Sequence, residues 1–325
     1  MSVIRNKQRL LHLYRYLMKN TDEDHQVTTN DLVAFLRQED ANASRKTVKD
    51  DIEVLIQEGV DIVTTKSYYN SYFVGDRQFE LPEIRFMIDG IAANVSLTTE
   101  QKDKMIDKLL KTLSIYQAEK LKANIVYTNR RGNEQFYYSI DRVTEAISAK
   151  KKIEFQYLDY SPSGEKVLKD DGKANTITPL ALRCSNNRFY VVGIAADTRK
   201  AVICRLDLMT KTRVLDEQGD PGPEKSKLDE YVGGLFMMQT GPLTVVVLEC
   251  GNDMMGAVMD KFGENVDFWK STSESFYVKA PVCVSNAFYA WVFMHDGNVK
   301  IVSPSYAVNG YMKMLGRASR QENRR

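Results

Sequence analysis

Basic and hydroxyl side chains gather at the start of one predicted helix, in the segment SRKTVKDDIEVLIQEG from Ser44 to Gly59. Ser44 is suited to cap this helix and Gly59 to end it. The outer face of its first turns carries Arg45, Lys46, Thr47 and Lys49. A recognition helix enters the major groove of DNA with its N-terminal end first. These residue types at these positions could therefore contact base edges and phosphates.

Two further helices and a hairpin must hold such a reading helix in place. Leucines at helical spacing predict a first helix over Val3–Lys19, and the run Thr28-Thr-Asn-Asp31 resembles a capping box that opens a second. Residues Asp61–Lys66 and Ser71–Val74 read as two strands around a turn. This hairpin would be a wing against the DNA backbone. The alternative is a three-helix packing unit with a charged surface.

The candidate DNA-contacting residues are basic, hydroxyl or aromatic: Arg5, Lys7, Ser44, Arg45, Lys46, Thr47, Lys49, Lys66 and Tyr68. The whole chain of 325 residues has 45 basic and 43 acidic side chains and a net charge of +2. Residues 1–75 hold ten basic and eleven acidic side chains, but the basic ones cluster at the starts of the first and third helices. We therefore expect a small basic footprint, modest non-specific affinity and a reliance on dimerisation.

The sequence contains no recognisable catalytic constellation. It lacks the motifs H-E-x-x-H, G-x-x-x-x-G-K-[ST], G-x-G-x-x-G and G-x-S-x-G, and its three histidines stand in unrelated contexts. Its four cysteines form no C-x-x-C pair, which favours a reducing cytosol and small buried hydrophobes. No apolar run is long enough to span a bilayer. We expect no enzyme activity, cofactor or metal, and a cytoplasmic location.

The rest of the chain reads as three further parts. Residues 79–134 predict a helical connector, in which Thr98-Thr-Glu-Gln101 reads as a second capping box. The alternating lysines and acids of Lys102–Lys111 would form a solvated face. A short helix is predicted around Asp141–Ala149. Short strands within 135–222 predict a small barrel or strongly curled sheet, followed by a linker at Asp216–Glu224. Residues 240–325 alternate strands and helices in a pattern typical of a ferredoxin-like α+β domain.

Motifs along the chain resemble one family in the expected order. SRKTVKDDIEVLIQEGVDI resembles the recognition helix of DeoR-like winged-helix bacterial regulators. Residues 151–209 resemble the WYL domain in KKIEFQY, ITPLAL, RFYVVG and CRLDLM, where the naming triplet stands as Phe189-Tyr190-Val191. FYAWVFMHDGNVKIVSPSYAVNGYMKML is similar to the C-terminal extension called WCX. The resemblance implies a winged helix-turn-helix domain at 1–78, the connector at 79–134, an Sm-like WYL barrel at 135–222 and a WCX-like dimerisation domain at 240–325.

The resemblance also implies an effector site on the WYL domain. Tyr157, Tyr190 and Arg205 match the family's pattern, and Arg183 and Arg188 join them by their proximity on the predicted strands. Tyrosine offers a stacking face and arginine binds phosphate through two hydrogen bonds. The structural alternative is that both tyrosines close the barrel core and that Arg205 pairs with a carboxylate such as Asp207.

Three positions depart from the family's pattern. Leu208 stands where relatives usually carry a second basic residue. Val202 and Ile203 stand where relatives often carry a histidine or arginine. The loss of such cations weakens an anionic site and favours a structural or protein-interaction role for the barrel.

We therefore expect a homodimeric, nucleoid-associated bacterial transcription regulator of α+β class that binds a duplex operator. A nucleotide or nucleic-acid effector on the WYL domain would tune operator binding. The alternative is an accessory protein that binds single-stranded nucleic acid and uses the barrel as its main surface.

Overall fold

The computed structural model describes residues 2–66, 70–128, 133–270 and 272–322. Its internal contacts divide the chain into two compact units, Met1–Glu134 and Gln135–Arg325. Both units combine helices with antiparallel sheets, which confirms the α+β class. Among the described helices, none is both long enough and apolar enough to cross a bilayer. The finer domain boundaries expected from the sequence stay predictions.

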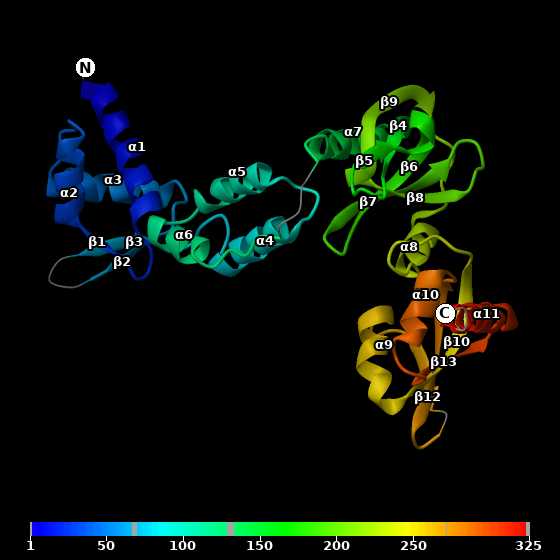
Figure 1. Ribbon diagram of the computed structural model, residues 1–325. Helices are drawn as coiled ribbons and strands as arrows, with labels where there is room; N and C mark the ends of the chain where they lie inside the picture. Colours follow the sequence, from blue (N-terminus) through cyan, green and yellow to red (C-terminus); the bar gives the residue numbers. More distant parts are fainter. Residues whose placement is uncertain (1, 67–69, 129–132, 271, 323–325) are drawn as a thin grey trace. The chain divides into compact units, whose positions relative to one another are not determined.

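The first unit begins with three helices and a small antiparallel sheet of order β1-β3-β2 (Figure 1). Its elements are α1 (Ser2–Asn20), β1 (Val27–Thr28), α2 (Thr29–Gln38), α3 (Arg45–Gln57), β2 (Ile62–Thr65) and β3 (Ser71–Val74). The predicted helices and hairpin are confirmed to within a few residues. β1 was not predicted, because its Thr28 also serves as the N-cap of α2. Apolar side chains from all three helices and the sheet form the core: Leu13, Leu17, Leu32, Leu36, Val48, Ile52 and Tyr72.

Three more helices complete the first unit: α4 (Leu81–Ala93), α5 (Thr99–Leu110) and α6 (Ile115–Lys122). Ile84, Ile88 and Ile106 belong to their shared core. The predicted capping box at Thr98 is confirmed, because its side chain accepts a hydrogen bond from the backbone N–H of Gln101. The sequence analysis missed α6.

Lys102 corrects the expectation that the charged run Lys102–Lys111 is wholly solvated. Its side chain is buried, and Nζ donates hydrogen bonds to the carbonyl oxygens of Ala92 at 2.9 Å and Thr128 at 3.1 Å. Burial lowers the pKa of Lys102 below its ordinary value. The other lysines of the run are exposed as expected. A charge pattern alone therefore did not reveal that one lysine anchors the loop beside α4.

The second unit opens with α7 (Phe136–Ala149) and a six-stranded antiparallel sheet. Its strands are β4 (Lys151–Tyr160), β5 (Lys166–Leu168), β6 (Ala174–Ser185), β7 (Arg188–Ala195), β8 (Ala201–Arg205) and β9 (Met209–Gln218). The order is β5-β4-β6-β7-β8. β9 pairs with β4 along the edge opposite β6. A short turn of helix, η2 (Leu206–Leu208), joins β8 directly to β9. No ladder among the described residues pairs these two strands, so the expected closed barrel is not found.

Three boundaries in this region differ from the sequence expectation. β9 extends through Gln218 and therefore includes the first residues of the predicted linker at Asp216. α8 (Lys225–Gly233) lies where no element was expected. α7 begins at Phe136 instead of Asp141, because the Phe136 ring is buried and contacts the Phe189 ring of β7.

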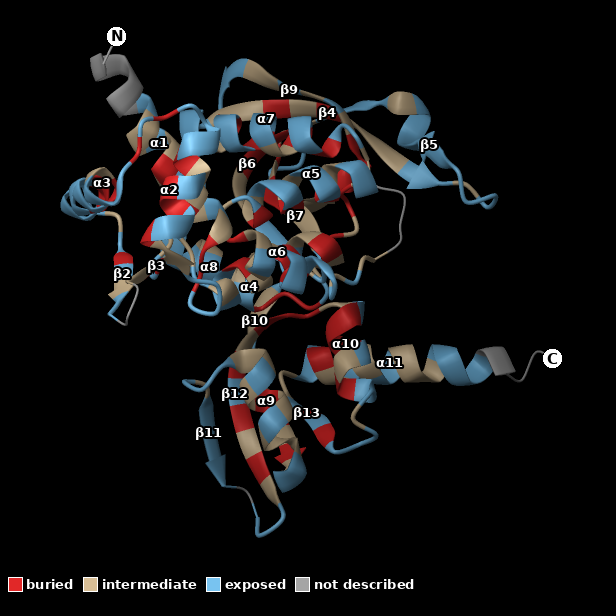
Figure 2. Cartoon of the chain, turned by 90° about the vertical axis from the view of Figure 1, so that its left-hand side faces the viewer, coloured by how far each residue is buried: buried red, intermediate tan, exposed pale blue. Residues whose placement is uncertain are grey.

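The last part of the chain is an antiparallel sheet of order β11-β12-β10-β13. Its elements are β10 (Leu243–Gly251), α9 (Met255–Phe262), β11 (Asp267–Lys270), β12 (Ser275–Cys283), α10 (Asn286–Phe293), β13 (Val299–Ser303) and α11 (Ser305–Glu322). Burial alternates along most of β12, as Figure 2 shows. β10 to β13 with α9 and α10 follow the βαββαβ order expected of a ferredoxin-like domain. β11 was missed because all four of its residues are exposed.

Candidate nucleic-acid interface and effector site

The start of α3 is fixed by Ser44 and Thr47, which cap each other. Ser44 Oγ accepts a hydrogen bond from the backbone N–H of Thr47 at 3.2 Å. Thr47 Oγ1 accepts one from the backbone N–H of Ser44 at 2.8 Å. Both hydroxyls thus satisfy amide groups that a helix start leaves unpaired. Their role in building the helix is established, and their contact with DNA stays a prediction.

The basic side chains of α3 differ in how firmly they are held. Arg45 donates a hydrogen bond from Nε to Oδ1 of Asn30 on α2 at 2.8 Å. Lys46 and Lys49 are exposed and have no ion pair or side-chain hydrogen bond among the described residues. They lie outside the buried face of α3, which includes Val48. Two exposed cations on the first turns of α3 create a small region of positive potential.

The exposed acidic residues of α3 lie one turn after these lysines: Asp50 follows Lys46, and Glu53 follows Lys49, by four residues, although no ion pair joins them among the described residues. Asp50 and Glu53 are exposed from the second turn onward. Asp51 is buried and binds Arg9 of α1 through two hydrogen bonds, from Nε at 2.6 Å and from Nη2 at 3.0 Å. The hydrogen bond to Asp51 raises the pKa of Arg9. Arg9 therefore joins α1 to α3 instead of adding to the basic footprint.

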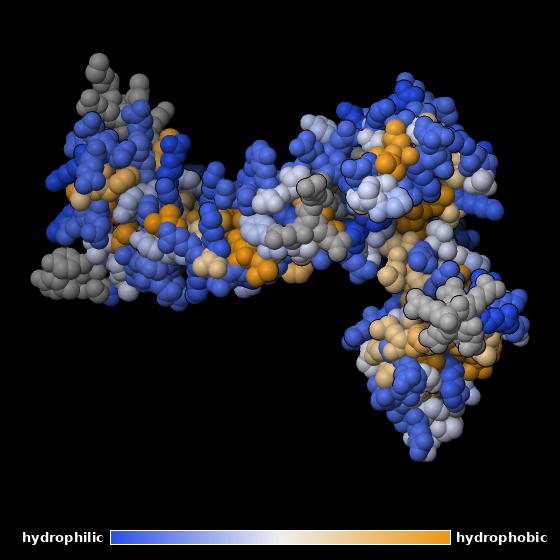
Figure 3. Space-filling view, viewed as in Figure 1, coloured by the Kyte–Doolittle hydropathy of each residue, from blue (hydrophilic) through white to orange (hydrophobic). Residues whose placement is uncertain are grey.

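The remaining predicted DNA contacts are less well defined. Arg5 and Lys7 belong to α1, but their side chains lie outside the described residues. Lys66 is exposed just after β2, at the side of the hairpin that leads to its turn. Tyr68 lies outside the described residues. Figure 3 shows mainly hydrophilic surface over the part of the first unit that α1–α3 form.

Three of the predicted effector residues form a row across neighbouring strands. Tyr190 of β7 is in register with Arg183 of β6 on one side and with Arg205 of β8 on the other. Directly opposed residues of neighbouring strands place their side chains on the same face. Arg188 shares this face because it lies two residues before Tyr190. The Phe189 ring, on the opposite face, contacts α7.

Arg205 and Tyr157 already have partners inside the protein. Arg205 binds Asp207 from Nε at 3.1 Å and from Nη2 at 2.7 Å. The Tyr157 hydroxyl accepts a hydrogen bond from the backbone N–H of Arg205 at 3.0 Å. Burial raises the pKa of Tyr157 to about 12, so its hydroxyl is protonated at neutral pH. The ion pair is the one named in the structural alternative, and Nε and Nη2 of Arg205 and the Tyr157 hydroxyl are already engaged within the protein.

Arg183, Arg188 and Tyr190 keep unused binding capacity on the same face. Arg183 is exposed, and the other two are half-buried. The buried Nε of Arg188 has no hydrogen-bond partner in the described part of the chain. Two guanidinium groups beside an aromatic ring are a suitable arrangement for a phosphate and a stacked base.

The positions that depart from the family pattern line the core or a nearby cavity. Leu208 is buried, so a hydrophobic contact stands where a cation was expected. Val202 and Ile203 line a cavity of about 500 Å³ together with Tyr157, Cys204 and Lys169. Burial raises the pKa of Cys204 to about 11, so this thiol is protonated and unreactive at neutral pH. Lys169 was not predicted as a site residue. It lies beside Tyr157 and Cys204 in this cavity only because β5 folds back on β4.

A polar junction, also missed, holds the three-helix part of the first unit against α5 and α6. Arg77 donates hydrogen bonds from Nη1 to the carbonyl oxygen of Met18 at 2.7 Å and from Nη2 to that of Thr21 at 2.6 Å. Ser114 donates a hydrogen bond from Oγ to Oδ2 of Asp22, and both residues are buried. These contacts link groups far apart in sequence, which no local motif could indicate.

His25 has a structural role at this junction. Its Nδ1 lies 2.7 Å from Oδ1 of Asp22, and its ring stacks on Tyr116 with centroids 3.6 Å apart. His25 is thus a packing residue at this junction. Among the described residues, no group of three or more histidine, cysteine or acidic side chains is arranged to hold a metal ion.

Comparisons with known proteins leave the assignment to the site itself. No protein-family model matches the chain, and no curated protein matches it. Similar solved structures include proteasome accessory factor B/C (PafBC) of Arthrobacter aurescens, at 13% identity and a TM-score of 0.29 over 97% of this chain and 49% of that one. Another is a CRISPR Cas-related protein, at 10% identity and a TM-score of 0.35 over 98% of this chain and 86% of that one. The chain thus spans about half the length of the PafBC chain. Likeness this weak carries no argument about function.

Proposed function

We propose that this chain is a DNA-binding transcription regulator of the WYL type, and that α3 reads duplex DNA. One observation carries the proposal: Lys46 and Lys49 are exposed, without a partner among the described residues, on the first turns of a capped helix that α1, α2 and a three-stranded sheet support. This is the arrangement that a winged helix uses to enter the major groove. The resemblance of the α3 sequence to DeoR-like recognition helices supports the same proposal.

The small number of available cations indicates that one reading head binds weakly. Arg9 is neutralised by Asp51, and Arg45 is held by Asn30. We therefore propose a homodimer that occupies two half-sites, because two linked weak contacts give a high joint affinity. The WCX-like, ferredoxin-like part at 240–325 is the proposed dimerisation domain.

The proposed effector is a nucleotide or oligonucleotide bound on the face of Arg183, Arg188 and Tyr190. Arg205 and Tyr157 would shape this face without contacting the ligand, because both are bound within the protein. The effector can change operator binding only if it prefers one of two arrangements of the regulator. The proposal includes no catalytic residue, cofactor or metal, and it assigns the protein to the cytoplasm and the nucleoid.

The second candidate is an accessory protein that binds single strands, and the row of Arg183 and Tyr190 favours it. Competition separates the two. The full chain is first used to select a duplex from a random library, and single strands of matching length then compete for it. A regulator stays bound to its duplex in the presence of an excess of single strands. The same excess displaces the duplex from an accessory protein.

Two pairs of substitutions assign the surface. Lys46→Ala with Lys49→Ala should weaken duplex binding, and Arg183→Ala with Arg188→Ala should leave it intact but abolish any effect of added nucleotide or oligonucleotide. Exposed Lys108 and Lys120 provide a matched control pair for the lost charge. If the α3 pair keeps full duplex affinity while the sheet pair loses all nucleic-acid binding, the second candidate is correct.

A further inference from the structure

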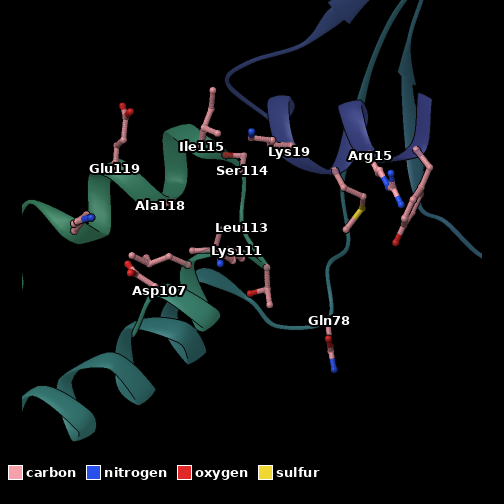
Figure 4. A pocket seen from close by; sticks show the side chains of 15 residues that line it. Arg15, Lys19, Gln78, Asp107, Lys111, Leu113, Ser114, Ile115, Ala118 and Glu119 are labelled. Carbon is pink, nitrogen blue, oxygen red and sulfur yellow. The ribbon is translucent and has the colours of Figure 1, made fainter. Parts of the chain in front are cut away.

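A cavity of about 800 Å³ lies within the first unit, where α1 faces the segment that joins α5 to α6 (Figure 4). Its volume is within the range of small-molecule sites, which is roughly 300–1,000 Å³. It is formed only by residues of the first unit and is separate from the sheet that carries the proposed effector face. The DNA-reading proposal uses none of its lining residues.

The walls of this cavity are largely apolar. Tyr14 and Met18 line it from α1, and Leu110, Leu113, Ile115 and Ala118 line it from α5, α6 and the segment that joins them. Leu110 and Leu113 are buried and belong to the core of the connector helices. Ser114, also in the lining, is held by its hydrogen bond to Asp22. The cavity therefore has a fixed wall, and the polar junction maintains it.

Basic side chains surround this apolar lining. Arg15 and Lys19 come from α1, whereas Lys111 and Lys122 come from the other side. All four are exposed, and none has an ion pair or a side-chain hydrogen bond in the part of the chain that the structure describes. Figure 4 shows Lys19 extending from α1 toward Ser114 and Ile115.

Two carboxylates, Asp107 and Glu119, also line the cavity. Four cations against two carboxylates leave it with a positive balance. Figure 4 shows Glu119 directed away from the Ser114 side, where Lys19 lies. The carboxylate of Glu119 therefore does not offset the charge of Lys19.

We propose that this cavity binds a small organic anion: an apolar body of aromatic or aliphatic groups that carries one acidic group. The apolar body would replace water against the leucine and methionine side chains, and the acidic group would lie beside Lys19 and Lys111. An inorganic phosphate gains little from the apolar walls, and an apolar cation is repelled by the surrounding charge. The proposal does not rest on DNA binding, because it concerns the affinity of the cavity alone.

Two fluorescent probes test the chemistry directly. Anilinonaphthalene sulfonate has an apolar aromatic body and one anionic group, and phenylnaphthylamine has the same ring system without the charge. Titration of the full chain should give a saturable site that binds the sulfonate about tenfold more tightly than the neutral probe, as expected for two exposed charge contacts. Equal affinity for the two probes would overturn the proposal.

Substitutions place the site in this cavity. Lys19→Met with Lys111→Met keeps most of the aliphatic stems and should remove the preference for the sulfonate, while affinity for the neutral probe is unchanged. Ala118→Trp should fill the cavity and weaken both probes at least tenfold. Lys120→Met, on α6 like Ala118 but outside the cavity lining, should leave the affinity for both probes unchanged.

The charge variants keep the test decisive if Ala118→Trp does not fold, because Lys19 and Lys111 are exposed and their loss leaves the core intact. Circular dichroism confirms the fold of each variant. Sulfonate binding that is unaffected by the lysine pair would place the dye on another apolar surface and contradict the proposal. The absence of any saturable binding, as when a second copy of the chain covers the cavity, would also contradict it.

Discussion

The basic residues of α3 and those of the β6–β8 row carry the same positive charge in different surroundings. Lys46 and Lys49 are exposed and have no partner among the described residues. Arg205 donates from Nε and Nη2 to the buried carboxylate of Asp207, and the Tyr157 hydroxyl accepts a hydrogen bond from the Arg205 backbone. Lys46 and Lys49 are thus available to a ligand, whereas Arg205 mainly stabilises its own sheet.

The comparison shows that a cation in a family motif is not automatically a ligand contact. A charged group held by a buried partner contributes to the fold, and a ligand must displace that partner before it can bind. An exposed lysine contributes little to stability and keeps its charge for phosphate. The following predictions test this division between structural and binding charges.

The largest effect is expected when Asp207 is replaced. Asp207→Ala leaves Arg205 half-buried without its carboxylate, and we expect the free energy of unfolding to fall by about 3 kcal/mol. Lys49→Ala should change it by no more than about 0.5 kcal/mol. Chemical denaturation followed by circular dichroism measures both. Equal stabilities for the two variants would show that the ion pair of Arg205 with Asp207 contributes no more to the fold than the exposed Lys49.

A smaller effect is expected for Tyr157→Phe, which removes the acceptor of the Arg205 backbone N–H. We expect a loss of about 1–2 kcal/mol at neutral pH. The folded-state pKa of Tyr157 is raised to about 12 from an ordinary 10.0. Its contribution is therefore fully present below the ordinary pKa and is lost as the pH rises through the folded-state pKa.

Denaturation at increasing pH checks this sign. The wild-type stability should fall more steeply than that of Tyr157→Phe between the two pKa values. Tyr190→Phe is the control, because Tyr190 lies on the same sheet without that hydrogen bond. Parallel curves for the wild type and Tyr157→Phe would show that burial does not raise the pKa of Tyr157 in the folded protein.

The smallest effect is expected at the start of α3. Ser44→Ala removes a capping hydroxyl and should cost about 1 kcal/mol of stability. Lys46→Ala, two residues later, should leave stability nearly unchanged and weaken DNA binding instead. Thermal denaturation and duplex titration of both variants test whether Ser44 affects stability and Lys46 affects DNA binding. If Ser44→Ala weakens DNA binding far more than Lys46→Ala, Ser44 itself is a principal contact.

Short-range patterns predicted much of the fold. Ser44, Thr28 and Thr98 marked helix starts correctly, because capping depends on residues three positions apart. The same signal, Ser114 followed by Gln117, precedes α6 and could have revealed that helix. β5 and β11 were missed because fully exposed strands carry no hydrophobic alternation.

Features that depend on long-range contacts could not be predicted in this way. Lys102 resembles its exposed neighbours in sequence, and only the position of the Ala92 and Thr128 carbonyl groups explains its burial. The pairing of Arg9 with Asp51 likewise changed the expected basic footprint, because it joins helices that are distant in sequence. The sequence identified the residue types of the candidate site, but it did not establish which of them already had partners.

The salt dependence of duplex binding tests the central claim most directly. Each phosphate contact contributes about one unit to the slope of log K against log salt concentration. Lys46→Ala with Lys49→Ala should therefore make the slope shallower by about 2 and weaken binding about ten- to hundredfold at physiological salt. The control pair Lys108→Ala with Lys120→Ala should keep the wild-type slope. A slope and affinity that survive the loss of Lys46 and Lys49 would show that α3 does not read DNA.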